Sequence, residues 1–177
     1  MRGLPALLVT LAVGAAVSVA PTPAVAGRGL LELQPGTLSI HAPTRASLGT
    51  VIRGSTLERV LGTVEVDDRR FSNPNPWTAT VTSTDFRLVG GSPTQVIPRA
   101  QVFYWSGPVV VQTGGGTVIP GQLTAAQAVS LSAPRVAMRK TTGSGNNRLV
   151  WQPRLRIVVP VATIAGTYTG TITHSVA

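Results

Sequence analysis

The sequence is built from short apolar or alternating runs that are separated at close intervals by glycine, proline and asparagine. Threonine and valine, which favour strands, are abundant in these runs. No long window carries apolar residues at the 3.6-residue spacing of an amphipathic helix. Many short strands between frequent turn signals are typical of an all-β fold. The pattern therefore predicts a single, mostly antiparallel β-sandwich of immunoglobulin-like type.

The expected strands follow from the positions of these runs. They lie near residues 37–41, 46–53, 61–67, 77–86, 101–106, 109–112, 128–132, 135–140, 149–159 and 167–176. The separators include Gly62 and the glycine, proline or asparagine clusters at 73–76, 90–91, 114–116 and 143–147, which strands avoid. Residues 124–129 form the single segment compatible with a helical turn, and no internal repeat is convincing.

The last run alternates in a way that is typical of a half-buried strand. Tyr168, Ile172, His174 and Val176 fall on one face, whereas threonines and Ser175 fall on the other. We therefore expect the final residues to belong to the fold, with no C-terminal attachment signal.

The N-terminus has the features of a secretory signal peptide. Arg2 supplies a positive start, residues 6–19 are uncharged and mostly apolar, and Ala24 and Ala26 give a small-x-small cleavage pattern. The alternative is a membrane anchor, but the apolar run is shorter than the roughly 18 to 20 residues that span a bilayer. We expect residues 1–26 to be removed and residues 27–177 to form one secreted domain.

Cysteine is absent, so an exported protein of this kind has neither disulfides nor a lipidated N-terminal cysteine. The longest later apolar stretch, residues 157–165, contains Pro160 and is too short to cross a bilayer. We expect no membrane partner after signal-peptide cleavage, and stability that comes from packing alone.

The charge is distributed unevenly. The chain has 15 Lys and Arg against six Asp and Glu, a net charge of +9, and all six acids precede Phe86. From Phe86 onward there are eight basic residues and no acid. Such a field attracts polyanions, which for an exported protein are anionic wall polymers, acidic polysaccharides, lipid headgroups or DNA.

Candidate polymer contacts come from this basic part of the chain. On the expected strand 149–159, Arg154 and Arg156 fall on the face opposite Trp151. The alternative is that these arginines only solvate the outer face of a sheet. Nucleic-acid binding is not expected, because aromatic platforms are missing apart from Trp151, which points inward. The candidate wall contacts are Arg135, Arg139, Lys140, Arg148, Arg154 and Arg156.

An enzymatic function is not expected. Adjacent Asp67 and Asp68 face opposite ways in a strand, so they cannot form an acid/base pair. No nucleophile elbow, cysteine nucleophile or His-Glu-x-x-His metal pair is present, and we expect no cofactor and no metal. His174 shares a face with apolar residues, where a hydrogen-bonded core histidine is the ordinary finding. A hydrolase with an unfamiliar site around Asp85 stays open as an alternative hypothesis, ranked after the two binding functions described below.

Two parts of the chain carry a resemblance to a known family, namely residues 75–86 and, far downstream, residues 158–160 followed by 166–173. In this order they resemble the WxL domain family of Gram-positive cell-surface proteins. Trp77 matches the first Trp-x-Leu motif, with Ala79 in place of leucine, while His174 and Val176 stand at the Trp and Leu positions of the distal motif. The family-motif positions, to which we assign a structural role, are Trp77, Asp85, Phe86, Tyr168, Ile172 and His174.

The resemblance implies a secreted β-rich domain that associates noncovalently with the cell wall, with peptidoglycan as the ligand. This agrees with the expected export and with the basic C-terminal part. A second hypothesis is an interaction module that pairs with a partner surface protein through its sheet edges. The use of 14 arginines and one lysine is typical of a high-GC, actinobacterium-like source.

Overall fold

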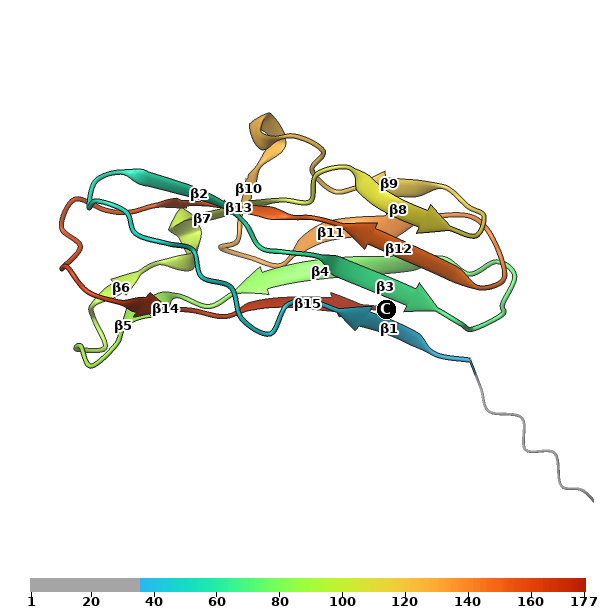
Figure 1. The fold of residues 1–177 in the computed structure, drawn as a ribbon, viewed down its shortest axis with the longest axis horizontal. Helices are drawn as coiled ribbons and strands as arrows, with labels where there is room; N and C mark the ends of the chain where they lie inside the picture. The colour runs from blue at the N-terminus through green and yellow to red at the C-terminus, as the bar shows by residue number, and fades with distance from the viewer. Residues whose placement is uncertain (1–35) are drawn as a thin grey trace, which may run out of the picture. The chain divides into compact units, whose positions relative to one another are not determined.

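The computed structural model describes residues 36–177, which form an all-β fold of short strands (Figure 1). The first strands in chain order are β1 (Leu38–His41), β2 (Thr56–Val60), β3 (Val64–Asp68), β4 (Trp77–Ser83), β5 (Phe86–Leu88), β6 (Val96–Ile97), β7 (Val102–Trp105) and β8 (Val109–Thr113). They are followed by β9 (Val118–Pro120), β10 (Val129–Ser130), β11 (Arg135–Lys140), β12 (Asn147–Trp151), β13 (Arg154–Val158), β14 (Tyr168–Thr169) and β15 (Ile172–Val176). Within this part of the chain the only helical elements are two 3-10 turns, η1 (Arg99–Gln101) and η2 (Ala125–Gln127). The expected signal peptide lies outside the described residues.

The strands pair into four sheets, and every pairing is antiparallel. The strand orders are β1-β3-β12-β8, β10-β7-β13-β2, β15-β4-β11-β9 and β14-β5-β6. The chain passes between the first two sheets over short connections, from β2 to β3, from β7 to β8 and from β12 to β13 (Figure 1). The predictions of an all-β fold and of mostly antiparallel pairing are confirmed.

The run at residues 149–159 is divided into β12 and β13 at Gln152 and Pro153. Proline has no N–H to donate to a ladder, which explains why the pairing is interrupted there. The side-chain alternation nevertheless continues through the break, since Leu149, Trp151 and Leu155 are all buried. The predicted inward face of this run is therefore correct.

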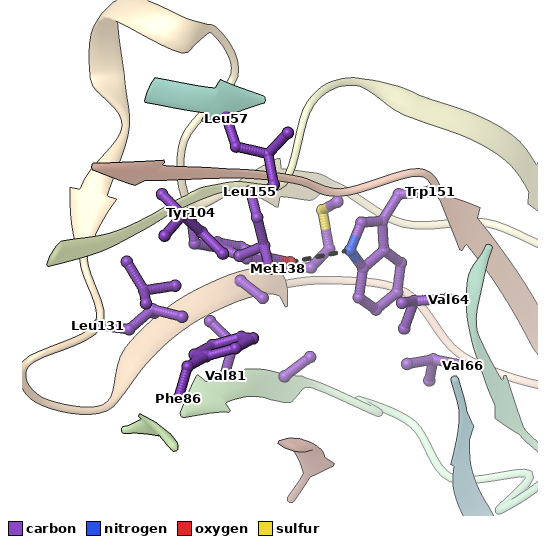
Figure 2. Close-up of a cluster of buried hydrophobic side chains, with 14 of the residues drawn as sticks. Leu57, Val64, Val66, Val81, Phe86, Tyr104, Leu131, Met138, Trp151 and Leu155 are labelled. Carbon is purple, nitrogen blue, oxygen red and sulfur yellow. Dashed lines mark hydrogen bonds between the residues drawn. The ribbon is translucent and has the colours of Figure 1, made fainter. Parts of the chain in front are cut away.

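One hydrophobic cluster fills the interior. In Figure 2 the side chains of Trp151 and Leu155, from β12 and β13, point into the interior, where Trp151 lies beside Val64 of β3 and Val81 of β4 lies beside Phe86. Met138 of β11 is also fully enclosed. Because the chain has no cysteine, this packing is the main source of its stability.

A chain of polar groups runs through this apolar interior. The indole Nε1–H of Trp151 donates to the hydroxyl of Tyr104 at 3.3 Å, and that hydroxyl lies 3.2 Å from Nε2 of His174 (Figure 2 shows the first bond). An indole can only donate, so the Tyr104 oxygen accepts from Trp151. Among the described residues Nε2 of His174 is the one acceptor within reach of the buried Tyr104 hydrogen, and we assign the hydrogen to that bond. The Tyr104 hydroxyl thereby links β12, β7 and β15.

A buried ionic cluster lies where β3 meets the loops around it. Nε and Nη2 of Arg70 donate to the two carboxylate oxygens of fully buried Asp68 at 2.9 and 3.0 Å. Lys140, only 2% exposed, donates to the side chain of Asn75, whose amide donates to the Gly145 carbonyl at 2.7 Å. Burial opposes ionisation of Asp68, but the hydrogen bonds and charge of Arg70, with the charge of Lys140, hold its pKa below the usual range.

The strand expected at residues 46–53 is absent from the structure, which has an irregular segment there. Gly49 adopts a φ of 84°, in the left-handed region that ends regular strand geometry. Conversely, β2, β6 and β9 were not predicted. Leu57 is the only buried residue of β2, so the hydrophobic alternation that would mark a strand is missing.

The Tyr104 hydroxyl can be tested by removing it alone. We expect Tyr104→Phe to lower the free energy of unfolding by about 1–3 kcal/mol, because the Trp151 donor and the His174 acceptor both lose their buried partner. The matched variant is Tyr168→Phe, which removes an exposed hydrogen bond of 2.9 Å from the Tyr168 hydroxyl to the Ile164 carbonyl. It should lower the free energy of unfolding by less than about 1 kcal/mol. Urea denaturation measures both values, and equal losses would contradict this role of Tyr104.

Two neighbouring aspartates allow a test of the ionic cluster. Asp68→Asn should cost about 3–5 kcal/mol, because it leaves Arg70 and Lys140 without their buried counter-charge. Asp67→Asn removes the same charge from an ion pair with Arg69, whose side chain is 67% exposed, and should cost less than about 1 kcal/mol.

The same pair of variants has a defined pH dependence. Since the folded-state pKa of Asp68 is depressed, its contribution is present above the ordinary Asp pKa and is lost as the pH falls through the folded value. The stability difference between the wild type and Asp68→Asn should therefore shrink in acid, in urea titrations repeated from neutral to acidic pH. A difference that does not change with pH would contradict the depressed pKa.

Candidate functional site

All five carboxylates of residues 36–177 are held by basic or backbone N–H groups. The pairs are Glu58 with Arg154 and Arg156, Glu65 with Arg148, Asp67 with Arg69, Asp68 with Arg70, and Asp85 with the backbone N–H of Arg99. The Glu65 pair is bidentate, with two bonds of 2.7 Å, and these bonds hold the pKa of Glu65 below its usual value although burial opposes the shift. Four of these side-chain carboxylates are paired with arginines, and Asp85 has no basic side chain of residues 36–177 within ion-pair distance.

Seven arginines of the described residues have no carboxylate within ion-pair distance. Residues 36–177 carry thirteen Arg and Lys against five Asp and Glu, a net charge of +8. These unneutralised arginines, which we call the free arginines, are Arg45, Arg53, Arg59, Arg87, Arg99, Arg135 and Arg139. All of them except half-buried Arg135 are exposed.

The structure brings two of the six predicted wall contacts together, since Arg154 and Arg156 both lie within ion-pair distance of Glu58. Arg148, Arg154 and Arg156 form ion pairs, and the Arg156 guanidinium also lies 5.4 Å from the ring centroid of Trp105. Half-buried Arg135 donates to the Ser130 carbonyl at 2.9 Å.

The remaining two predicted wall contacts, Arg139 and Lys140, differ sharply in exposure. Arg139 is exposed on β11, with no ion pair among the described residues. Lys140 is buried in the ionic cluster, which is a correction to its expected place on the surface. The physical reason is that Asn75 and Asp68 supply the oxygen atom and the charge that let an ammonium group be enclosed.

The family-motif positions are all buried or half-buried, but their two key residues do not meet. Trp77, 3% exposed, lies opposite Lys140 on β11, whereas His174 lies opposite Val81, four residues further along β4. The other members are buried Phe86 and half-buried Asp85, Tyr168 and Ile172.

A cavity of about 170 Å³ lies between the irregular segment 42–48 and β15. We call it the His174 pocket. Its apolar lining comes from both sides of the core, and its polar lining is contributed by the irregular segment and by the start of β15. The apolar residues are Ala42, Pro43, Ala46, Leu48, Leu61, Val64, Phe86, Leu155 and Ile172, the polar residues are Thr44, Arg45, Thr171 and His174, and Gly170 completes the lining.

His174 presents a defined hydrogen-bonding face to this pocket. Burial lowers its pKa to about 4, so the imidazole is neutral at physiological pH. Because Nε2 accepts from Tyr104, the hydrogen of the neutral ring sits on Nδ1. No residue among 36–177 forms a hydrogen bond with Nδ1, and this atom is not enclosed. The site therefore offers a free N–H donor.

Of the polar residues in the pocket, sequence reasoning singled out His174 alone. Arg45 and Thr44 lie in a segment with no recognisable pattern, and Thr171 lies among many alternating threonines. The pocket joins residues more than 120 positions apart, so no local signal marks it.

Asp67 is half-buried and Asp68 fully buried on opposite faces of β3, as predicted, so they form no acid/base pair. Within residues 36–177, no three His, Asp or Glu side chains are grouped so that they could hold a metal ion. No helix in this part of the chain has the length and apolar character needed to span a bilayer.

Comparison with known proteins leaves the family open. No family model matches the chain, and no curated protein matches it. One solved structure similar to it belongs to a study of glycolipid glycan hydrolysis by a family 123 glycoside hydrolase from Clostridium perfringens, with 14% identity and a TM-score of 0.37 over 71% of this chain. The chain spans 19% of the length of that enzyme, and a similarity of this size carries no argument about function.

Proposed function

We propose that this protein is a secreted, non-enzymatic domain that binds an anionic polymer of the bacterial cell wall without covalent attachment. The observation that carries the proposal is the set of free arginines, which remains after every described carboxylate has been engaged. We further propose that the fold is a single immunoglobulin-like β-sandwich at residues 27–177, released from a signal peptide at residues 1–26.

Free arginines suit this function for a physical reason. A guanidinium presents a planar set of donors that matches phosphate and carboxylate groups, and it stays charged at all physiological pH values. At physiological ionic strength the screening length is only about 8 Å, so an exposed charge acts on a polymer that touches the surface. Arginines already held in ion pairs contribute much less to such contacts, because each of them has a carboxylate nearby, with Glu58 shared by Arg154 and Arg156.

Two sequence features support the location and the ligand. The N-terminal pattern is that of a signal peptide, and the chain resembles the WxL domain family, whose members associate noncovalently with the wall. Peptidoglycan and the anionic polymers attached to it are therefore the first ligands to test.

A second candidate function, pairing with a partner surface protein through a sheet edge, rests on β8. This edge strand has no charged residue and no proline, and four of its five residues are exposed, including Val110 at 55%. Two other edges are better protected, since β2 carries Glu58 and Arg59 and β9 ends at Pro120. A bulge at Val110 is the only such protection of β8.

The wall proposal is tested by incubating the protein with purified cell-wall sacculi over a salt series. We expect the protein to pellet with the sacculi at about 0.01 M salt and to be released near 1 M, because the screening length falls from about 30 Å to about 3 Å. Protein that stays in the supernatant at low salt would contradict the proposal, and salt-independent pelleting would contradict its electrostatic basis.

Two triple variants with the same loss of charge provide the control. Arg53, Arg87 and Arg139 are free arginines, and their joint replacement by glutamine should lower the salt concentration of release clearly. The matched triple replaces Arg69, Arg148 and Arg154, which are ion-paired, and should shift the release less. A larger shift for the ion-paired triple would contradict the assignment of the free arginines.

The edge proposal predicts self-association or partner pairing through β8. Val110→Lys places a charge on this edge and should weaken any multimer seen by light scattering over a concentration series by about tenfold or more. Val161→Lys, at an exposed loop position, is the matched control and should leave the multimer unchanged. A monomer at every concentration would show that β8 does not pair with itself.

A further inference from the structure

We propose that the His174 pocket binds a small carboxylate with a short apolar body, whose carboxylate accepts hydrogen bonds from the Arg45 guanidinium and from Nδ1–H of His174. The proposal shares Arg45 with the free arginines but does not depend on wall binding, because the other free arginines lie outside the pocket lining. It rests on the lining of the pocket, on its size and on the fixed tautomer of His174.

The polar lining selects the charge of the ligand. Arg45 and His174 offer only N–H donors, and Thr44 and Thr171 add hydroxyl groups. No Asp or Glu among the described residues lines the pocket, so nothing there neutralises Arg45. A ligand with negative charge and acceptor oxygens therefore complements this side, whereas a cation does not.

The apolar lining selects the body of the ligand. Leu48, Leu61 and Ile172 line the pocket and are only half-buried, so part of their apolar surface is accessible there. A bare anion such as inorganic phosphate would leave this surface without a partner. A branched aliphatic group would cover it and would gain from its removal from water.

The size of the pocket limits the ligand to a few atoms. An apolar cavity of about 150 Å³ accommodates a benzene molecule, which has six heavy atoms. The His174 pocket, at about 170 Å³, is thus suited to a compound such as 3-methylbutanoate.

The tautomer of His174 preorganises the pocket for a ligand atom that accepts a hydrogen bond from Nδ1–H. Tyr104 is completely buried and directs its hydrogen to Nε2, and the Tyr104 oxygen is in turn held by the Trp151 indole. The imidazole therefore needs no proton exchange and no tautomer change to donate from Nδ1. A donor fixed in advance costs little to engage when a ligand binds.

The test is an NMR titration of the ¹⁵N-labelled protein with 3-methylbutanoate and with its neutral counterpart, 3-methylbutanamide. We expect the acid to shift the amide signals of Thr171 and His174 and to saturate with a Kd of about 1–10 mM, as befits a ligand of this size. The amide should bind at least about tenfold more weakly, because it carries no charge for Arg45. The His174 side-chain signals should show Nδ1 protonated throughout.

Variants separate the contributions of the pocket. Arg45→Gln should reduce the affinity for the acid to that for the amide, whereas Arg53→Gln, at an exposed position outside the pocket lining, should leave it unchanged. Ala46→Leu narrows the pocket without altering charge and should abolish saturable binding.

The source of the carboxylate is resolved by N-acetyl-Gly-Leu, with a free or an amidated C-terminus. Tighter binding of the free peptide than of 3-methylbutanoate identifies a chain terminus as the ligand, and the reverse order identifies a free acid. The proposal is overturned if neither carboxylate gives saturable shifts, if acid and amide bind equally, or if His174 carries its hydrogen on Nε2.

Discussion

The buried hydroxyl of Tyr104 is the interaction on which both the interior and the His174 pocket depend. Enclosing polar groups is costly unless each finds a partner, and this core encloses an indole N–H and an imidazole nitrogen. The Tyr104 hydroxyl satisfies both with one oxygen and one hydrogen, at 3.3 and 3.2 Å. The same arrangement sets which nitrogen of His174 carries the hydrogen. Stability and binding chemistry therefore share a single group, and the imidazole cannot be altered without affecting the core.

The buried and half-buried carboxylates follow a similar rule, since each has a hydrogen-bonding or ionic partner. Every described carboxylate is taken by an arginine or a backbone N–H, and the most deeply enclosed one, Asp68, is surrounded by Arg70 and Lys140. The carboxylates thus take part in contacts within the fold, while the arginines in excess of them lie mostly at the surface. A net charge of +8 on residues 36–177 is therefore a property of the exterior, where it acts on contacts with other molecules more than on folding.

The sequence was sufficient for features that repeat locally. The alternation of residues 149–159 predicted the inward position of Trp151, and the adjacency of Asp67 and Asp68 predicted their opposite faces. The sequence did not predict features that depend on contacts between residues far apart in the chain. Lys140 follows exposed Arg139 after a register shift in β11, and its burial depends on Asn75, 65 positions away. The pocket likewise depends on the packing of the irregular segment against β15, which no local pattern encodes.

The irregular segment is the least constrained wall of the pocket. Residues 42–51 form no backbone hydrogen bond with any other described residue, so their position is set mainly by the packing of Leu48 and Val51 against the core. His174, in contrast, is fixed by its strand and by Tyr104. A carboxylate held between Arg45 and His174 would tie the segment to β15 and would stabilise the folded state by mass action. Part of the binding free energy would be used to fix the segment, so the affinity of the pocket is controlled by the segment that carries Arg45 more than by the histidine.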